Sequence, residues 1–193
     1  MDRQRFGAAI LHRAGWGWDG QPPDDPVVVI VVAPHTSNWD LPLMLLLCWA
    51  TGIEPRFLLK REAFRGPAGP VLRRLGGVAV DRSSPHGLVE QLAAEAHGSE
   101  RMQIIVAPEG TRKRTRYWKS GFYRLAQQAD LPMCLAYCDA RNKRMGFGPV
   151  FRPSGDIHAD MDRIREFYAD KSGVKFDRGT PPRLREEDEP PAG

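Results

Sequence analysis

Residues 27–33 read VVVIVVA, an unbroken run of apolar and mostly β-branched side chains. Such a run, with no alternating polar residues, is typical of a strand buried on both faces of a parallel sheet. Residues 41–50 follow with LPLMLLLCWA, and Pro42 sits near the beginning, where the first turn of a helix tolerates proline. The two runs therefore predict a buried strand followed directly by an apolar helix.

Strand-like and helix-like segments continue to alternate toward the C-terminus, and one further helix is expected before residue 27. We expect strands at residues 56–59, 76–80, 102–107, 132–138 and 146–151, and helices at residues 2–14, 64–75, 85–97 and 118–129. Strands and helices that alternate in this way are typical of folds in which helices cover a parallel sheet. The sequence thus predicts an α/β fold with a mostly parallel central sheet flanked by helices.

The length of 193 residues fits a single domain with a sizeable core. The last part of the chain is rich in Pro, Gly, Arg and Glu and contains almost no apolar residues. That composition is typical of segments that bury too little apolar surface to fold. We expect one domain over residues 1–176 and a flexible C-terminal tail over residues 177–193.

The charge and the cysteine content limit the kinds of ligand and the cellular setting that fit this chain. The chain has 28 basic and 24 acidic residues, a net charge of +4, which suits an anionic ligand, lipid headgroup or nucleic acid without choosing among them. No apolar run approaches the roughly 18 residues of a membrane-spanning helix, and the N-terminus does not resemble a secretory signal. Cys48, Cys134 and Cys138 show no CxxC spacing and cannot all pair within one chain. These features predict a reduced, cytoplasmic setting.

A first candidate site is the segment PHTSNWD, residues 34–40, directly after the first strand. Reactive groups gather at the carboxyl ends of strands in open α/β sheets. A loop that enters a helix can fold the carboxylate of Asp40 back onto the imidazole of His35. A carboxylate bonded to one ring nitrogen fixes the tautomer and leaves the other nitrogen free as a general base. The alternative is a solvent-facing histidine and an aspartate that caps the helix.

A second candidate is the segment APEGTR, residues 107–112, again directly after an apolar strand. Gly110 allows close approach of a ligand to the backbone, and Thr111 offers a hydroxyl. Arg112 carries a planar fork suited to two oxygens of a phosphate or carboxylate. Glu109 could accept a hydrogen bond from a ligand hydroxyl or hold the loop. The alternative is a turn closed by a Glu109–Arg112 pair without any ligand.

Two further cations follow predicted strands. Lys60 comes after FLL at residues 57–59, and Arg82 ends the segment GVAVDR at residues 77–82. Both residues would lie at the carboxyl edge of a parallel sheet, where they could add positive charge to an anion site. Either side chain could equally be a solvated surface charge.

Together these motifs resemble the phospholipid/glycerol acyltransferase family, which includes lysophosphatidic acid acyltransferases. The HxxxxD motif of that family matches His35 and Asp40. Its second motif matches residues 77–82, its PEGTR motif matches residues 108–112, and its fourth resembles residues 131–133. All four motifs occur in the order found in the family. Together they make the resemblance far more specific than a match to any single motif would be.

The resemblance implies a role for each matched residue. His35 would deprotonate the acceptor hydroxyl, which attacks an acyl thioester directly, and Asp40 would orient His35. Arg112 and the backbone of residues 109–111 would position the acceptor phosphate, with help from Arg82 and Lys60. The donor would be acyl-CoA or an acyl carrier protein, and the acceptor 1-acyl-glycerol-3-phosphate, giving phosphatidic acid. No metal or bound cofactor is implied.

The stretch RKRTRYWK, residues 112–119, interleaves five basic residues with two aromatic ones. It could bind nucleic acid, or an anionic membrane surface, where each nearby cation adds about 1 kcal/mol, or it could be a solvated charged loop. We favour the membrane because the stretch begins inside the acceptor site, so we expect peripheral association with the inner membrane face and no nucleic acid partner. The alternatives are an acyltransferase for another amphipathic alcohol, such as a lyso-ornithine lipid or glycolipid, and a non-enzymatic basic module that binds anions or nucleic acid.

Overall fold

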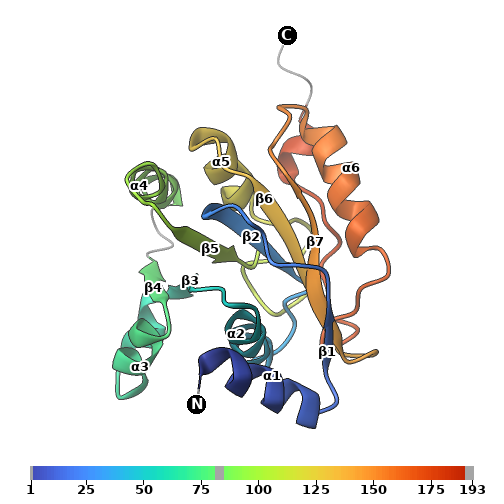
Figure 1. Ribbon diagram of the computed structural model, residues 1–193. Helices are drawn as coiled ribbons and strands as arrows, with labels where there is room; N and C mark the ends of the chain where they lie inside the picture. The colour runs from blue at the N-terminus through green and yellow to red at the C-terminus, as the bar shows by residue number, and fades with distance from the viewer. Residues whose placement is uncertain (1, 81–84, 190–193) are drawn as a thin grey trace.

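The computed structural model describes residues 2–80 and 85–189 (Figure 1). Within this part of the chain one sheet contains β1 (Gly17–Asp19), β2 (Val27–Ala33), β3 (Pro55–Lys60), β4 (Gly77–Val80), β5 (Met102–Val106), β6 (Met133–Asp139) and β7 (Arg144–Phe151). The spatial order is β1-β7-β6-β2-β5-β3-β4, and every neighbouring pair is parallel except β6 and β7. The predicted α/β fold with a mostly parallel sheet is confirmed.

Helices cover both faces of this sheet (Figure 1). They are α1 (Arg3–Arg13), α2 (Asp40–Thr51), α3 (Ala68–Arg74), α4 (Pro85–His97), α5 (Gly121–Gln128) and α6 (Ile157–Tyr168), with two short 3-10 turns, η1 (Arg61–Phe64) and η2 (Arg185–Asp188). Helices α1 and α2 pack on one face, whereas α4, α5 and α6 pack on the other. Over residues 2–80 and 85–189, no helix combines the length and apolarity needed to cross a bilayer.

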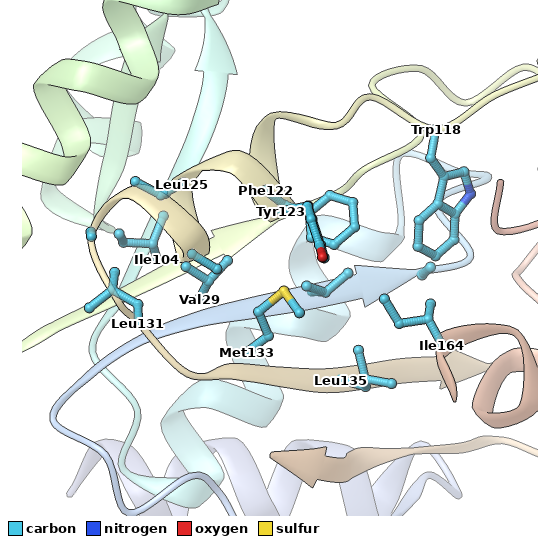
Figure 2. Packing of buried hydrophobic residues seen from close by; sticks show 14 of the residues in the cluster. Val29, Ile104, Trp118, Phe122, Tyr123, Leu125, Leu131, Met133, Leu135 and Ile164 are labelled. Atoms are coloured by element: carbon cyan, nitrogen blue, oxygen red, sulfur yellow. The ribbon is translucent and has the colours of Figure 1, made fainter. Parts of the chain in front are cut away.

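The central strand β2 explains why its sequence is apolar throughout. Val29, Val31 and Ala33 lie in the core beneath α4, α5 and α6, part of which Figure 2 shows. Val28 and Ile30 lie in the core beneath α1 and α2. Successive side chains of a strand point to opposite faces, so a strand covered on both sides needs apolar residues at every position.

Two elements differ from the sequence-based prediction. The helix expected at residues 64–75 is shorter in the structure: α3 covers Ala68–Arg74. Phe64 instead ends η1, and Gly66 between the two adopts a left-handed φ of +87°. Helix α6 was not expected. It begins after Asp156, whose carboxylate accepts the backbone N–H groups of His158 and Ala159, a typical N-cap arrangement.

The expectation of a flexible tail from residue 177 is wrong for residues 177–189, while residues 190–193 lie outside the described part. Leu184 is completely buried in the core beside α5 and α6. Glu186 pairs with Arg124 at 2.8 Å, and Glu187 pairs with Arg165 at 2.7 Å. The charged composition that suggested disorder instead supplies ion pairs to arginines of the two helices.

Candidate active site

The sheet topology brings the two candidate loops together. Strands β2 and β5 are parallel neighbours with Val31 opposite Val106, so the loops that follow them leave from the same edge. Strand β3 is the next neighbour of β5, and its last residue, Lys60, lies at this edge as well. The candidate loops after β2 and β5 and Lys60 at the end of β3 therefore lie together at the carboxyl edge of the sheet, as expected for an open α/β fold.

His35 and Asp40 form the pair that their spacing predicts. The Nδ1 atom of His35 lies 3.0 Å from Oδ2 of Asp40, the first residue of α2. The same Oδ2 accepts the backbone N–H groups of Thr36 at 2.7 Å and Ser37 at 2.8 Å. The aspartate is 7% exposed and the histidine 29%, so the carboxylate is held inside the loop while the ring reaches solvent. Asp40 thus both closes the loop and contacts the imidazole.

This arrangement assigns different tasks to the two ring nitrogens of His35. An imidazole whose Nδ1 faces a carboxylate carries its proton there, which leaves the Nε2 lone pair available to accept one. None of the residues that the structure describes bonds to Nε2. The carboxylate of Asp40 also stabilises the positive charge that appears when Nε2 takes up a proton. The pair therefore has the geometry of a general base.

Glu109 connects the second loop to the first. Its side chain is 1% exposed, and its Oε1 accepts the backbone N–H of His35 at 3.1 Å. Burial raises the pKa of this carboxyl to about 8, against the opposing effect of the N–H groups of His35 and Thr180. Of the two roles considered for Glu109, holding the loops together is the one for which a contact is seen, the bond to the N–H of His35. The Glu109–Arg112 pair considered as an alternative is not formed.

The remaining predicted site residues differ in how the structure places them. Gly110 adopts a left-handed φ of +64°, which turns the chain after Glu109, and the Thr111 hydroxyl accepts the backbone N–H of Lys113 at 3.3 Å. Arg112 and Lys60 are exposed, and neither forms an ion pair with a residue in the described ranges. Their cationic groups are therefore free to meet an anion. Arg82 lies outside the described residues.

An apolar cavity begins at the histidine–aspartate pair. His35 and Asp40 line one part of it, and Met44 and Leu47 of α2 and Ile105 of β5 are among the apolar residues that line the rest. Its volume is about 30 Å³, which holds only a water molecule or two. The cavity lies between α2 and the sheet.

Sequence reasoning missed the residues that brace this site. The hydroxyl of Thr36, inside the first motif, accepts the backbone N–H of Lys175 at 2.9 Å. The indole Nε1 of Trp118 donates to the carbonyl of Thr180 at 2.9 Å. These contacts join residues that are far apart in the chain, so no local sequence pattern predicts them.

Comparison with known proteins agrees with this geometry. The acyltransferase family model matches residues 22–138, more than half of the chain and both candidate loops. The crystal structure of the 1-acyl-sn-glycerophosphate (LPA) acyltransferase, PlsC, from Thermotoga maritima is similar in fold, with a TM-score of 0.58 and 17% identity over 89% of this chain and 80% of that one. The sequence matches no curated protein. With the family model spanning the sheet and both motif loops, the chain belongs to the acyltransferase family and is an acyltransferase enzyme.

Proposed function

We propose that this acyltransferase moves a fatty acyl group from a thioester to the hydroxyl of a lysophospholipid, with 1-acyl-glycerol-3-phosphate as the preferred acceptor and phosphatidic acid as the product. The observation that carries the proposal is the His35–Asp40 pair beside an apolar cavity, tied to the PEGTR loop by Glu109. A base and a cationic loop at one sheet edge match an acceptor with a hydroxyl and an anionic headgroup.

The proposed reaction needs one base and no covalent intermediate on the enzyme. Nε2 of His35 takes the proton of the acceptor hydroxyl as its oxygen attacks the thioester carbon. The carbon–sulfur bond then breaks, and the leaving thiolate takes the proton back from the imidazolium. Asp40 stabilises the imidazolium between these steps. The donor is acyl-CoA or an acyl carrier protein, and the reaction as proposed uses neither a metal nor a bound cofactor.

Recognition of the headgroup phosphate is assigned to Arg112, with Lys60 and Arg82 as additional cations. The exposed guanidinium of Arg112 makes no competing ion pair within the described part of the chain, so it can give two N–H groups to a phosphate. The raised pKa of Glu109, about 8, keeps that carboxyl mostly neutral near pH 7. A neutral Glu109 does not repel a phosphate bound by the same loop.

Access to the acceptor is proposed to occur at the inner face of the membrane. Trp39, four residues from His35, is 68% exposed, and Phe176, the residue after Lys175 whose N–H bonds to Thr36, is 57% exposed. Residues 112–119 add basic side chains around the same edge. Aromatic and basic side chains together favour the interface of an anionic bilayer.

The test is acyl transfer by the purified protein to a panel of lysolipids, with labelled acyl-CoA and acyl carrier protein as alternative donors. We expect transfer to 1-acyl-glycerol-3-phosphate, and we expect Arg112→Ala to raise the KM for this acceptor while leaving the KM for the donor unchanged. Arg13→Ala, an exposed arginine in the last turn of α1, is the matched control. Transfer only to a lyso-ornithine lipid or a glycolipid would show that this lipid, and not 1-acyl-glycerol-3-phosphate, is the acceptor. Salt-sensitive oligonucleotide binding without any acyl transfer would overturn the proposal.

A further inference from the structure

Residues 172–184, here called the C-terminal strap, follow α6 and lie outside the segment that the family model matches. The strap crosses the carboxyl edge of the sheet. The carbonyl of Ser172 accepts the backbone N–H of Ala140 after β6 at 3.1 Å, and that of Arg183 accepts the N–H of Trp118, in the loop after β5, at 2.8 Å. Between these ends the strap passes the loop after β2, so it meets the three loops in the order of their strands in the sheet.

The strap holds the first motif at Thr36, which lies next to His35. The Thr36 hydroxyl, buried inside the loop, accepts the backbone N–H of Lys175 at 2.9 Å. At Gly173 the strap approaches so closely that a Cβ atom would lie 2.6 Å from the Thr36 Oγ1 and 2.7 Å from its Cγ2. Only glycine fits this approach, so the contact depends on the residue type at position 173.

The strap holds the second loop through Thr180, whose hydroxyl and carbonyl both face that loop. The Thr180 hydroxyl accepts the backbone N–H of Thr115 at 3.0 Å, and its carbonyl accepts the indole N–H of Trp118 at 2.9 Å. Glu109, near the start of the same loop, accepts the N–H of His35 at 3.1 Å, so this loop connects the strap to the base.

We propose that Thr180 is a positioning residue: by bonding Thr115 and Trp118 it fixes the loop after β5 against the HxxxxD loop, so that the His35–Asp40 pair keeps its geometry. This inference rests on the proposed role of His35 as the base. Thr180 acts through this loop and not on the substrate or the reacting atoms. A displacement of about 1 Å at a catalytic group lowers turnover by about 100-fold.

The variant Thr180→Val keeps the shape and backbone of the residue and removes the hydroxyl acceptor. We expect kcat to fall by about 10- to 100-fold with the KM for the donor unchanged, at temperatures well below the melting temperature. Thr180→Ser keeps the hydroxyl and should restore most of the rate. Thr51→Val, which removes a hydroxyl bonded at 2.8 Å to Leu47 at the far end of α2, controls for the general effect of such a change.

A second readout does not depend on turnover. Nitrogen NMR of the His35 ring should show a single Nδ1–H tautomer in the natural protein and a mixture of tautomers in Thr180→Val. If Thr180→Val does not fold, Gly173→Ala displaces the strap at its other end and should give the same two changes. A lowered melting temperature with unchanged kcat and an unchanged NMR spectrum would overturn the positioning role. Absence of acyl transfer in the natural protein would instead overturn the proposed function, while the tautomer comparison would still test the strap.

Discussion

The most informative perturbation of the proposed base is Asp40→Asn, because the structure separates what this carboxylate does for folding from what it does for catalysis. Its Oδ2 meets the N–H groups of Thr36 and Ser37 and the ring of His35. An asparagine oxygen in that position still accepts both backbone N–H groups, so the loop should keep its conformation. The negative charge beside the imidazolium is lost.

The size of the effect follows from these contacts. A hydrogen bond to a charged group contributes about 1.5–3 kcal/mol, which corresponds to about 10- to 150-fold in rate. The asparagine oxygen still accepts the Nδ1–H of His35, so the tautomer of the ring is kept. We therefore expect kcat of Asp40→Asn to fall by about 10- to 150-fold with little change in stability. Asp40→Ala should lower the stability as well, because two buried N–H groups lose their acceptor at about 1–3 kcal/mol each.

The assay is steady-state transfer of a labelled acyl group, with urea unfolding measured on the same samples. Asp139→Asn is the matched control, since Asp139 is another buried carboxylate at the same sheet edge, bonded to Arg141 and Asn142. Asp139→Asn should keep the full transfer rate. The reasoning is refuted if Asp40→Asn transfers acyl groups at the natural rate, or if its activity falls only in proportion to the unfolded fraction.

Three further predictions follow from burial. Since folding raises the pKa of Glu109 to about 8, the folded state binds more protons than the unfolded state between about pH 4.5 and 8. Stability should therefore fall as pH rises through this window, by at most about 1.4 kcal/mol per pH unit, and urea titrations of Glu109→Gln should show a weaker dependence. Burial raises the pKa values of the thiols of Cys48, Cys134 and Cys138 to about 12, so a thiol reagent at pH 8 should react with them only after unfolding; rapid reaction of the folded protein would contradict their burial. Leu184→Ala should lower the free energy of unfolding by about 2–5 kcal/mol, and an unchanged midpoint in urea would show that residues 177–189 do not pack as described.

Features set by short stretches of chain could be predicted from the sequence. The apolar run of β2 predicted burial on both faces, because successive side chains of a strand point to opposite faces and all of them are apolar. The His35–Asp40 pair forms within one loop, whose backbone N–H groups fold the carboxylate back. Helix α6 also has a local signal that was overlooked, since Asp156 precedes apolar residues at helical spacing, of which Met161 and Ile164 are buried.

Features that depend on distant residues could not be predicted in this way. The hydrogen bond from the His35 N–H to Glu109 joins residues that are 74 positions apart in the sequence. It forms because β2 and β5 are neighbours in the sheet, and no short stretch of sequence specifies that pairing. Either role of Glu109 was consistent with the sequence, because burial decides between them. The packing of residues 177–189 depends on Arg124 and Arg165, which turn a charged segment into a set of ion pairs.

The central claim is that Nε2 of His35 removes the proton of the acceptor hydroxyl. Its most direct test is the rate of labelled acyl transfer to 1-acyl-glycerol-3-phosphate by His35→Ala, with His158→Ala, an exposed histidine on α6, as the matched control. We predict that His35→Ala loses about 10²- to 10⁴-fold in kcat while the control keeps the natural rate. Transfer by folded His35→Ala at the natural rate would contradict the claim.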